Sequence, residues 1–326
     1  MSSNHIQVAI FDHANAVPPH VLTALEKNEP NANCILPTLQ KSRQLESSGQ
    51  RPPRRQMWVV CSSKNSAGQM MVDFVLSITE GNIDSYPLFF STSLPVRQLT
   101  QDFVVPRMQE IVKALANTSI PVERVYAVYG PDTLAKVFAK CWTTATGVAN
   151  LSNAPYYAAK LSFCTRGSFR DRPVNIRGDF TFEIRPANPP YALTQEGAHR
   201  EANYQVAHNL IWIHRITRRG SSVSEVASIV AFSRNSTRNA TITKVYTDPG
   251  CRRMGCAERL VREVTRFLLG TKETVSLFVA HDNPGAAHVY SRVGFVGLDP
   301  QEGSVPGVDN WSEIGFDRNV VRLGHW

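Results

Sequence analysis

The stretch TDPGCRRMGCAERLVREVTRF, residues 247–267, decides the fold, because it begins as a loop and continues as a helix. Its proline and glycine favour a turn, and from residue 257 onward apolar side chains recur at helical spacing. We expect a helix that starts near Met254 or Gly255, with an apolar stripe toward the core and charged residues toward water. The stripe consists of Leu260, Val261, Val264, Phe267 and Leu268, and the expected water-facing residues are Glu258, Arg259, Arg262, Glu263 and Arg266.

The start of this helix is suited to an anion. Its first backbone N–H groups have no partner within the helix, and the helix dipole makes that end positive. Gly255 and Ala257 leave the backbone uncovered, and Arg252 and Arg253 add positive charge. We therefore expect a phosphate or diphosphate at this position. A P-loop is excluded, because the two residues after the second glycine of 250–255 are cysteine and alanine instead of lysine and serine or threonine.

The composition is that of a soluble globular protein. The chain has 326 residues, of which 42% are hydrophobic and 19% charged, enough for two domains. The N-terminus lacks an apolar core of signal-peptide length, and no run approaches the ~18 apolar residues of a membrane span. We expect a cytoplasmic protein without a membrane partner, and a nuclear location is compatible with the same features.

Charge and cysteine content narrow the classes further. Six scattered cysteines indicate reduced thiols instead of a disulfide framework. The net charge of +8 raises the question of nucleic acid, but the basic residues are dispersed, and the densest runs, 51–55 and 215–219, have no aromatic interleaving. A site for an anionic cofactor accounts for part of the charge equally well, so nucleic acid is not the expected partner.

The order of elements predicts an α/β or α+β protein. Residues 1–55 are expected to be irregular, since 42–56 is polar and contains proline. Short apolar runs beyond residue 57 predict strands, and helices are expected near 103–116 and 131–146. The polar segment 166–178 suggests a boundary, which gives domains 1–175 and 176–326. The second domain alternates strands with helices, as in a mixed, mostly antiparallel sheet flanked by helices.

The sequence CRRMGCAERLV, residues 251–261, resembles the acyl-CoA-binding signature of the GNAT acyl-CoA N-acyltransferase superfamily, [QR]-x-x-G-x-[GA]. Arg252, Gly255 and Ala257 occupy its three defined positions. The preceding ITKVYTDP resembles the family's fourth strand, which diverges from its neighbour and pairs through its backbone with the pantetheine arm. Val245 and Thr247 match the pairing positions.

A second, independent resemblance lies in LFVAHDNPGAAHVYSRVGFVGL, residues 277–298. This stretch resembles the family's strand, N-x-x-A-x-x-x-Y helix and Gly-Phe. The matching residues are Asn283, Ala286, Tyr290, Gly294 and Phe295. The resemblance implies that Asn283 caps the helix and contacts the coenzyme A arm, and that Tyr290 protonates the departing thiolate. Upstream, FEIRPANP at 182–189 resembles the family's first strand.

These motifs span about residues 180–298 and imply a GNAT fold for the C-terminal domain. The N-terminal α/β half is expected to be a divergent copy of it, since 122–142 repeats a strand followed by a helix. The whole arrangement resembles an uncharacterised group of fungal N-acetyltransferase-like proteins.

The resemblance implies transfer of an acetyl group from acetyl-CoA to an amine acceptor by direct attack, without a metal. The acceptor stays open among small amines, amino acids, polyamines and proteins. The residues expected to bind the cofactor are Val245, Tyr246, Thr247, Arg252, Arg253, Met254, Gly255, Cys256, Ala257, Asn283, Ala286 and Tyr290.

Tyr290 is the expected catalytic residue, as the general acid. The general base stays open, because relatives often carry a glutamate on the fourth strand where this chain has Thr243, Lys244 and Val245. The alternatives are ordered water and four side chains, Glu225, His208, His281 and Asp282. The missing glutamate favours a second hypothesis, a catalytically inactive acyl-CoA-binding or protein-interaction module.

Two cysteines, Cys251 and Cys256, flank the anion-binding loop. Without a second pair of ligands they do not form a zinc site. A cysteine at a helix start can have a lowered pKa, so a covalent acyl-enzyme is a minor alternative to direct attack.

Overall fold

A computed structural model describes the chain except for residues 1–4, 53, 66, 82–83, 153–154, 175–179, 187–195 and 325–326. The chain divides into two compact units. Unit 1 comprises Met1–Lys160 with Asp309–Trp326, and unit 2 comprises Leu161–Val308. The domain limits expected from the sequence, 1–175 and 176–326, stay a prediction.

Unit 1 is a sheet in the order β1-β2-β3-β4-β5-β12-β6, in which β4 and β5 are parallel and the other neighbours antiparallel. Its elements are β1 (Ile6–Phe11), α1 (Pro19–Glu26), α2 (Leu36–Ser47), β2 (Met57–Lys64), β3 (Met70–Ile78), β4 (Leu88–Ser91), α3 (Gln101–Ala116), β5 (Ala127–Pro131), α4 (Asp132–Thr146), β6 (Tyr157–Thr165) and β12 (Asn310–Gly315). Short 3-10 turns lie at Ala14–Ala16, Val96–Gln98 and Val122–Arg124.

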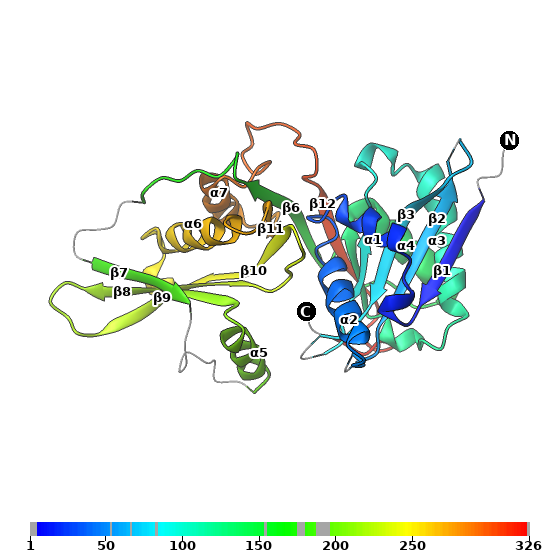
Figure 1. Cartoon of the computed structure of the whole chain (residues 1–326), viewed down its shortest axis with the longest axis horizontal. Coiled ribbons are helices and arrows are strands. Elements are labelled where there is room, and N and C mark those ends of the chain that lie inside the picture. The colour runs from blue at the N-terminus through cyan, green and yellow to red at the C-terminus, as the bar shows by residue number, and fades with distance from the viewer. Residues whose placement is uncertain are drawn as a thin grey trace. The chain divides into compact units, whose positions relative to one another are not determined.

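Alternation along the strands gives the unit 1 sheet two apolar faces. In β2, Val59 and Cys61 belong to the core cluster that also contains the buried stripes of α3 and α4. Trp58 and Val60 are equally buried and point to the opposite face. Figure 1 shows α1 and α2 on one side of this sheet and α3 and α4 on the other.

The expectation that residues 1–55 are irregular is wrong. They contain β1, α1 and α2. The sequence signal for a helix is weak in α2, because this helix has many polar residues and buries only Leu36, Leu39 and Ser42. These elements are fixed by tertiary partners: β1 pairs with β2 along its full length, from Ile6 to Phe11.

Unit 2 contains the strands that follow in the same strand order, β6-β11-β10-β9-β8-β7, in which β10 and β11 are parallel. The other printed pairs, β7 with β8, β8 with β9 and β9 with β10, are antiparallel. Its further elements are β7 (Phe180–Pro186), α5 (Glu196–Ala207), β8 (Ile211–Arg218), β9 (Ser224–Phe232), β10 (Asn239–Thr247), a 3-10 turn (Pro249–Cys251), α6 (Cys256–Leu269), β11 (Thr274–Ala280) and α7 (Pro284–Val293). In Figure 1, α6 and α7 lie on one face of this sheet and α5 on the other.

The two halves of the sequence follow one order of elements. Each has a strand, one or two helices, three antiparallel strands, a helix, a parallel strand, a helix and a last strand. The last strands are exchanged: β12 lies next to β5 in unit 1, and β6 continues into unit 2 beside β11. The repeat is therefore one of topology, although no repeat is visible in the sequence.

Candidate functional site

Strand β10 pairs with β9 as far as its last residue, but its pairing with β11 ends earlier. Its antiparallel pairing with β9 extends to Thr247, with a register shift between Ile242 and Lys244. Its parallel pairing with β11 runs from Asn239 to Ile242. The last part of β10 therefore diverges from β11, as the resemblance to the family's fourth strand implies.

The diverging part of β10 turns backbone groups toward the β11 side. Asp248 N–H donates to β9, and Ser228 on β9 donates to the Tyr246 carbonyl at 2.7 Å. Because successive residues of a strand direct their N–H and C=O to opposite sides, those of Val245 and Thr247 point away from β9. These are the two positions that the sequence assigns to the pantetheine arm.

The loop after β10 turns sharply and ends in a glycine. The Asp248 carboxylate accepts a hydrogen bond from Gly250 N–H at 2.8 Å and closes a turn. Arg253 and Gly255 both have a left-handed backbone, with φ of 61° and 74°. A Cβ on Gly255 would lie 3.0 Å from Val174 Cγ1 and 3.2 Å from an Arg259 nitrogen. The left-handed backbone favours glycine here, and a Cβ would have close contacts with both side chains.

The first turn of α6 is open to an anion. Gly255 is the N-cap and offers no side-chain acceptor, so the N–H groups of the first helical residues keep their donor capacity. Arg252 and Arg253 are exposed beside this turn, and Arg252 Nε lies 3.4 Å from the Thr247 carbonyl oxygen. The residues present therefore fit a diphosphate.

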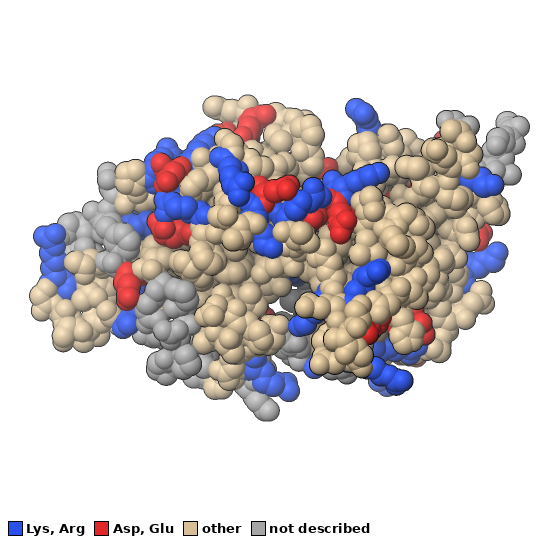
Figure 2. Space-filling model, viewed as in Figure 1, with Lys and Arg blue, Asp and Glu red and all other residues tan. Residues whose placement is uncertain are grey.

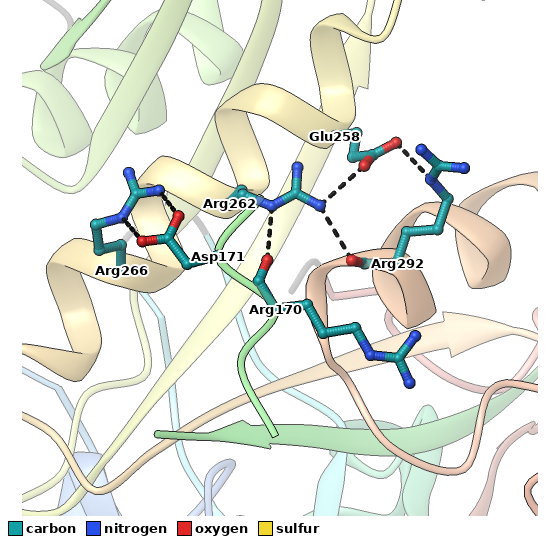
Figure 3. Close-up of polar contacts among 6 residues, drawn as sticks. All are labelled: Arg170, Asp171, Glu258, Arg262, Arg266 and Arg292. Carbon is teal, nitrogen blue, oxygen red and sulfur yellow. Dashed lines mark hydrogen bonds and ion pairs between the residues drawn. The ribbon is translucent and has the colours of Figure 1, made fainter. Parts of the chain in front are cut away.

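Three of the five α6 residues that were expected to face water are buried, while the side chains of Glu263 and Arg266 are exposed as expected. Glu258, Arg259 and Arg262 are 7%, 6% and 2% exposed. Arg262 donates to the backbone carbonyls of Arg170 and Arg292 at 2.9 and 3.0 Å (Figure 3). The segment after β6 and the end of α7 thus cover this part of the polar face of α6.

Glu258 is the centre of a buried charge network. Its two oxygens accept from Arg262 at 2.9 Å and from Arg292 at 2.8 Å (Figure 3). Burial alone would raise the pKa of Glu258, but the hydrogen bonds from both arginines outweigh it and hold this pKa below its usual value. The carboxylate therefore stays ionised and fixes the first turn of α6 to α7.

The exposed end of α6 carries mixed charge. Arg266 pairs with Asp171 and Glu263, and Figure 2 shows basic and acidic side chains interspersed over α6 and α7. Phe267, expected in the apolar stripe, is 55% exposed and lies against Trp212, with 5.0 Å between ring centroids. That expectation is wrong, because Phe267 lies at the edge of the stripe.

A buried histidine beneath the loop escaped the sequence analysis. His214 on β8 is fully buried, and Arg259 Nε donates to its Nε2 at 3.1 Å. Burial, together with the Arg259 charge, lowers the pKa of His214 to about 4. It is therefore a neutral acceptor at pH 7 that holds Arg259 under Gly255. The alternation of β8 predicts a buried position here, but not its partner.

The two loop cysteines do not have lowered pKa values. Burial raises the pKa of Cys251 and of Cys256, and in Cys256 this outweighs the lowering effect of Arg259. Both thiols lie in an apolar cluster with Ile216 and Ala227. This environment argues against the covalent route.

Helix α7 begins and ends as the motif predicts. The Asn283 side chain caps it by accepting from Ala286 N–H at 3.0 Å. Gly294 ends it with φ of 114°, where a Cβ would lie 2.1 Å from the Ser168 carbonyl oxygen. Tyr290 is 8% exposed and packs edge-on against Phe295, with centroids 5.9 Å apart. The asparagine cap is confirmed, and the role of Tyr290 stays a prediction.

The side chains considered as a base do not gather at one place. All four are exposed: Glu225 lies on β9, His208 follows α5, and His281 and Asp282 are neighbours in the loop between β11 and α7. His208 Nδ1 lies 2.8 Å from the carbonyl oxygen of Tyr204 on its own helix. At the strand position where relatives carry glutamate, Lys244 pairs with Glu201 of α5 at 2.9 Å.

Comparison with known proteins identifies the architecture. Residues 220–302 match the family model described as FR47-like protein, a GNAT-related family. A tandem GNAT protein from the clavulanic acid biosynthesis pathway aligns with 95% of this chain and 98% of its own at 13% identity, with a TM-score of 0.51. The chain has the tandem GNAT fold. The GNAT resemblance and the expected GNAT-like N-terminal half are thereby confirmed at the level of fold.

Two further solved structures are similar to this chain over most of its length. A Drosophila protein gives a TM-score of 0.58 at 12% identity, over 97% of this chain and all of its own. A GCN5-related N-acetyltransferase from Sphaerobacter thermophilus gives 0.50 at 12% identity, over 94% of each chain. No curated protein matches the sequence significantly. Among the described residues, no helix has the length and apolar character needed to cross a bilayer.

Proposed function

We propose that the protein is an acyl-CoA-dependent N-acyltransferase that transfers an acetyl group from acetyl-CoA to an amine. The observation that carries this proposal is the early separation of β10 from β11, which ends in the glycine-capped start of α6. Its structural neighbours include GNAT acetyltransferases. We propose as well that the protein acts in the cytoplasm and that it needs no metal. We also propose that it belongs to the fungal group of N-acetyltransferase-like proteins.

The diphosphate, the pantetheine arm and the acyl thioester of acetyl-CoA each have residues suited to them. The diphosphate would lie at the first turn of α6, beside Arg252 and Arg253. The pantetheine amides would pair with the backbone of Val245 and Thr247, which points toward the β11 side. Bound acetyl-CoA supplies an activated acyl thioester, and the N–H groups of this strand are suited to polarising the acyl carbonyl.

Tyr290 is the proposed general acid for the departing sulfur. Removing a positioned acid lowers turnover by about 10²-fold or more, so Tyr290→Phe is expected to lose turnover while keeping its affinity for coenzyme A. Thiol release from acetyl-CoA with a panel of amines measures the first, and calorimetry the second. An equal loss of affinity would instead assign Tyr290 to packing around the cofactor.

The direct test of the site is a coenzyme A titration of Arg252→Ala/Arg253→Ala. Both side chains are exposed, so the variant should fold, and we expect its affinity to fall at least tenfold. The control is Arg266→Ala, which removes an exposed arginine near the other end of α6. Equal affinity in wild type and in the double variant would refute the assignment.

One observation favours a second function, an acyl-CoA-binding module without turnover. The strand position that carries a glutamate in relatives has Thr243, whose hydroxyl lies 3.2 Å from Ser233 Oγ, and Lys244, which is ion-paired. Neither is suited to accept a proton from an ammonium group. Coenzyme A binding without thiol release for any amine would select this module.

A further inference from the structure

A groove of about 430 Å³ lies between α3 and α4 of unit 1. None of its lining residues belongs to the proposed acyl-CoA site. One stripe of each helix forms it: Val105 and Val112 at helical spacing on α3, and Val137 and Cys141 on α4. The volume is within the range of small-molecule sites, about 300–1,000 Å³.

The groove has an apolar floor and small residues at one end. Val112 and Val137, which are 3% and 6% exposed, belong to the core cluster of unit 1, and Val105 packs against that cluster. Ala116 and Ala145, at the C-terminal ends of the two helices, also line the groove. Their methyl groups are too small to fill the space between the helices, so the floor can take up an aliphatic chain.

The charged residues that line the groove are all basic. Lys113 on α3 and Lys140 on α4 line the groove, and none of its described lining residues is acidic. Lys140 makes no ion pair with any carboxylate in the described part of the chain. Lys113 has Glu110 at 3.8 Å, a pair in which both side chains are largely exposed and thus weakly held. Both cations are therefore available to an anion.

We propose that this groove binds a straight-chain fatty carboxylate. Its aliphatic body would cover Val105, Val112 and Val137, and its head group would lie between Lys113 and Lys140. Burial of the chain supplies most of the affinity, and the two lysines, whose stems also cover apolar surface, select the sign of the head group. This site is independent of the proposed acetyl transfer.

The test is calorimetry of the full chain with decanoate, decanol and decyltrimethylammonium, each below its micelle concentration. The three share one alkyl body, so the expected order of affinity is decanoate, then decanol, then the cation. Lys113→Glu/Lys140→Glu should weaken decanoate at least tenfold and leave decanol within twofold. The control Lys27→Glu/Lys64→Glu, with the same change of net charge at exposed residues outside the groove, should bind decanoate as wild type does.

A variant that fills the groove tests whether decanoate binds there. Ala145 is exposed, so Ala145→Trp should fold, and its indole should displace both decanoate and decanol. The proposal is overturned if wild type does not bind decanoate, if the cation binds equally well, or if neither the lysine variant nor Ala145→Trp changes the affinity. Binding only to anionic vesicles, and not to free decanoate, would also overturn it.

Discussion

The two halves of the chain share one order of elements but differ where the fourth strand passes into the next helix. In the C-terminal half, β10 separates from β11 and α6 starts at Gly255, beside Arg252 and Arg253. In the N-terminal half, α3 starts after Thr100 and carries the exposed Asp102 in its first turn. Helix α6 has a first-turn carboxylate too, but Glu258 is buried and paired with Arg262 and Arg292. The start of α6 therefore offers exposed arginines to an anion, whereas the start of α3 offers an exposed carboxylate, which disfavours one.

The end of the fourth strand differs as well. In the N-terminal half, Asn31 accepts hydrogen bonds from Ser91 Oγ and Thr92 N–H, both at 3.1 Å, and is 3% exposed. The chain's own side chain thus uses the polar groups that follow β4. Equal topology therefore does not imply equal chemistry, and we expect the C-terminal half alone to bind coenzyme A.

The largest effect expected is that of a carboxylate at the C-terminal junction. Gly255→Glu should lower coenzyme A affinity at least a hundredfold, because it fills the space beside Val174 and places a negative charge at the start of α6. Gly220→Glu is the matched control, since its φ of 82° imposes the same strain of about 1–2 kcal/mol but a Cβ there meets nothing within 4 Å. Equal affinity losses in the two variants, measured by calorimetry, would contradict this account of the junction.

A second comparison concerns one buried arginine in each half. Arg107 of α3 pairs with Asp73 at 2.8 Å, and Arg262 of α6 pairs with Glu258 at 2.9 Å. Arg107→Met should cost about 3–5 kcal/mol of unfolding free energy, since it leaves the buried carboxylate of Asp73 without its ion-pair partner. Arg262→Met should cost less than this, since Arg292 still pairs with Glu258. Denaturant unfolding measures this, and Arg266→Met, which breaks exposed pairs, should cost less than about 1 kcal/mol.

Only one of these two variants should also weaken coenzyme A binding. Arg262 holds Glu258 in the first turn of α6, whereas Arg107 lies in the half without the junction. A loss of coenzyme A affinity in Arg107→Met equal to that in Arg262→Met would remove the distinction between the halves.

The next effect is a pH dependence specific to the C-terminal half. The pKa of His214 is about 4 in the folded state and 6.5 in its ordinary state, so protonation favours unfolding. Stability is fully present above pH 6.5 and falls as the pH drops toward 4, by about 3 kcal/mol in total. This loss of stability can be measured as faster hydrogen exchange of the β8 amides. The pH dependence should vanish in His214→Phe and persist in His208→Phe. A wild-type protection independent of pH over this interval would disprove the assignment.

The smallest effect concerns Asn31 in the N-terminal half. Asn31→Ala should cost about 1–2 kcal/mol, because Thr92 N–H loses a buried acceptor. Thermal unfolding measures this cost. The variant should still bind one coenzyme A, since the charge of the α3 start is unchanged. Binding of a second coenzyme A to Asn31→Ala would show that the Asn31 side chain alone prevents coenzyme A from binding to the N-terminal half.

The sequence predicts the site best where its signals are local. The ends of β10, the start of α6 and the Asn283 cap depend on residues within a few positions of one another, and turn, capping and periodicity rules apply to them directly. The buried face of α6 was missed because its cover is distant: Arg262 bonds to the carbonyl of Arg170, which is 92 positions away. The i,i+4 spacing of Glu258 and Arg262 is the local signal that could have suggested a pair.

The N-terminal half was harder to predict for a related reason. Its first strand and first helix are short, α2 is mostly polar, and β1 is held by pairing with the distant β2, so the elements before residue 57 were not predicted. The helix expected near 103–116 is confirmed as α3, and five of its apolar residues, which recur at helical spacing, are buried. They are Val104, Met108, Ile111, Val112 and Leu115.

The central claim is that one half of a duplicated fold keeps the coenzyme A junction. Its most direct test is calorimetry of the wild-type chain with coenzyme A, combined with hydrogen exchange of the complex. The account predicts one coenzyme A per chain, with added protection confined to residues 243–258 and the start of α7. Two coenzyme A molecules per chain, none, or protection at Thr92 and the start of α3 would contradict it.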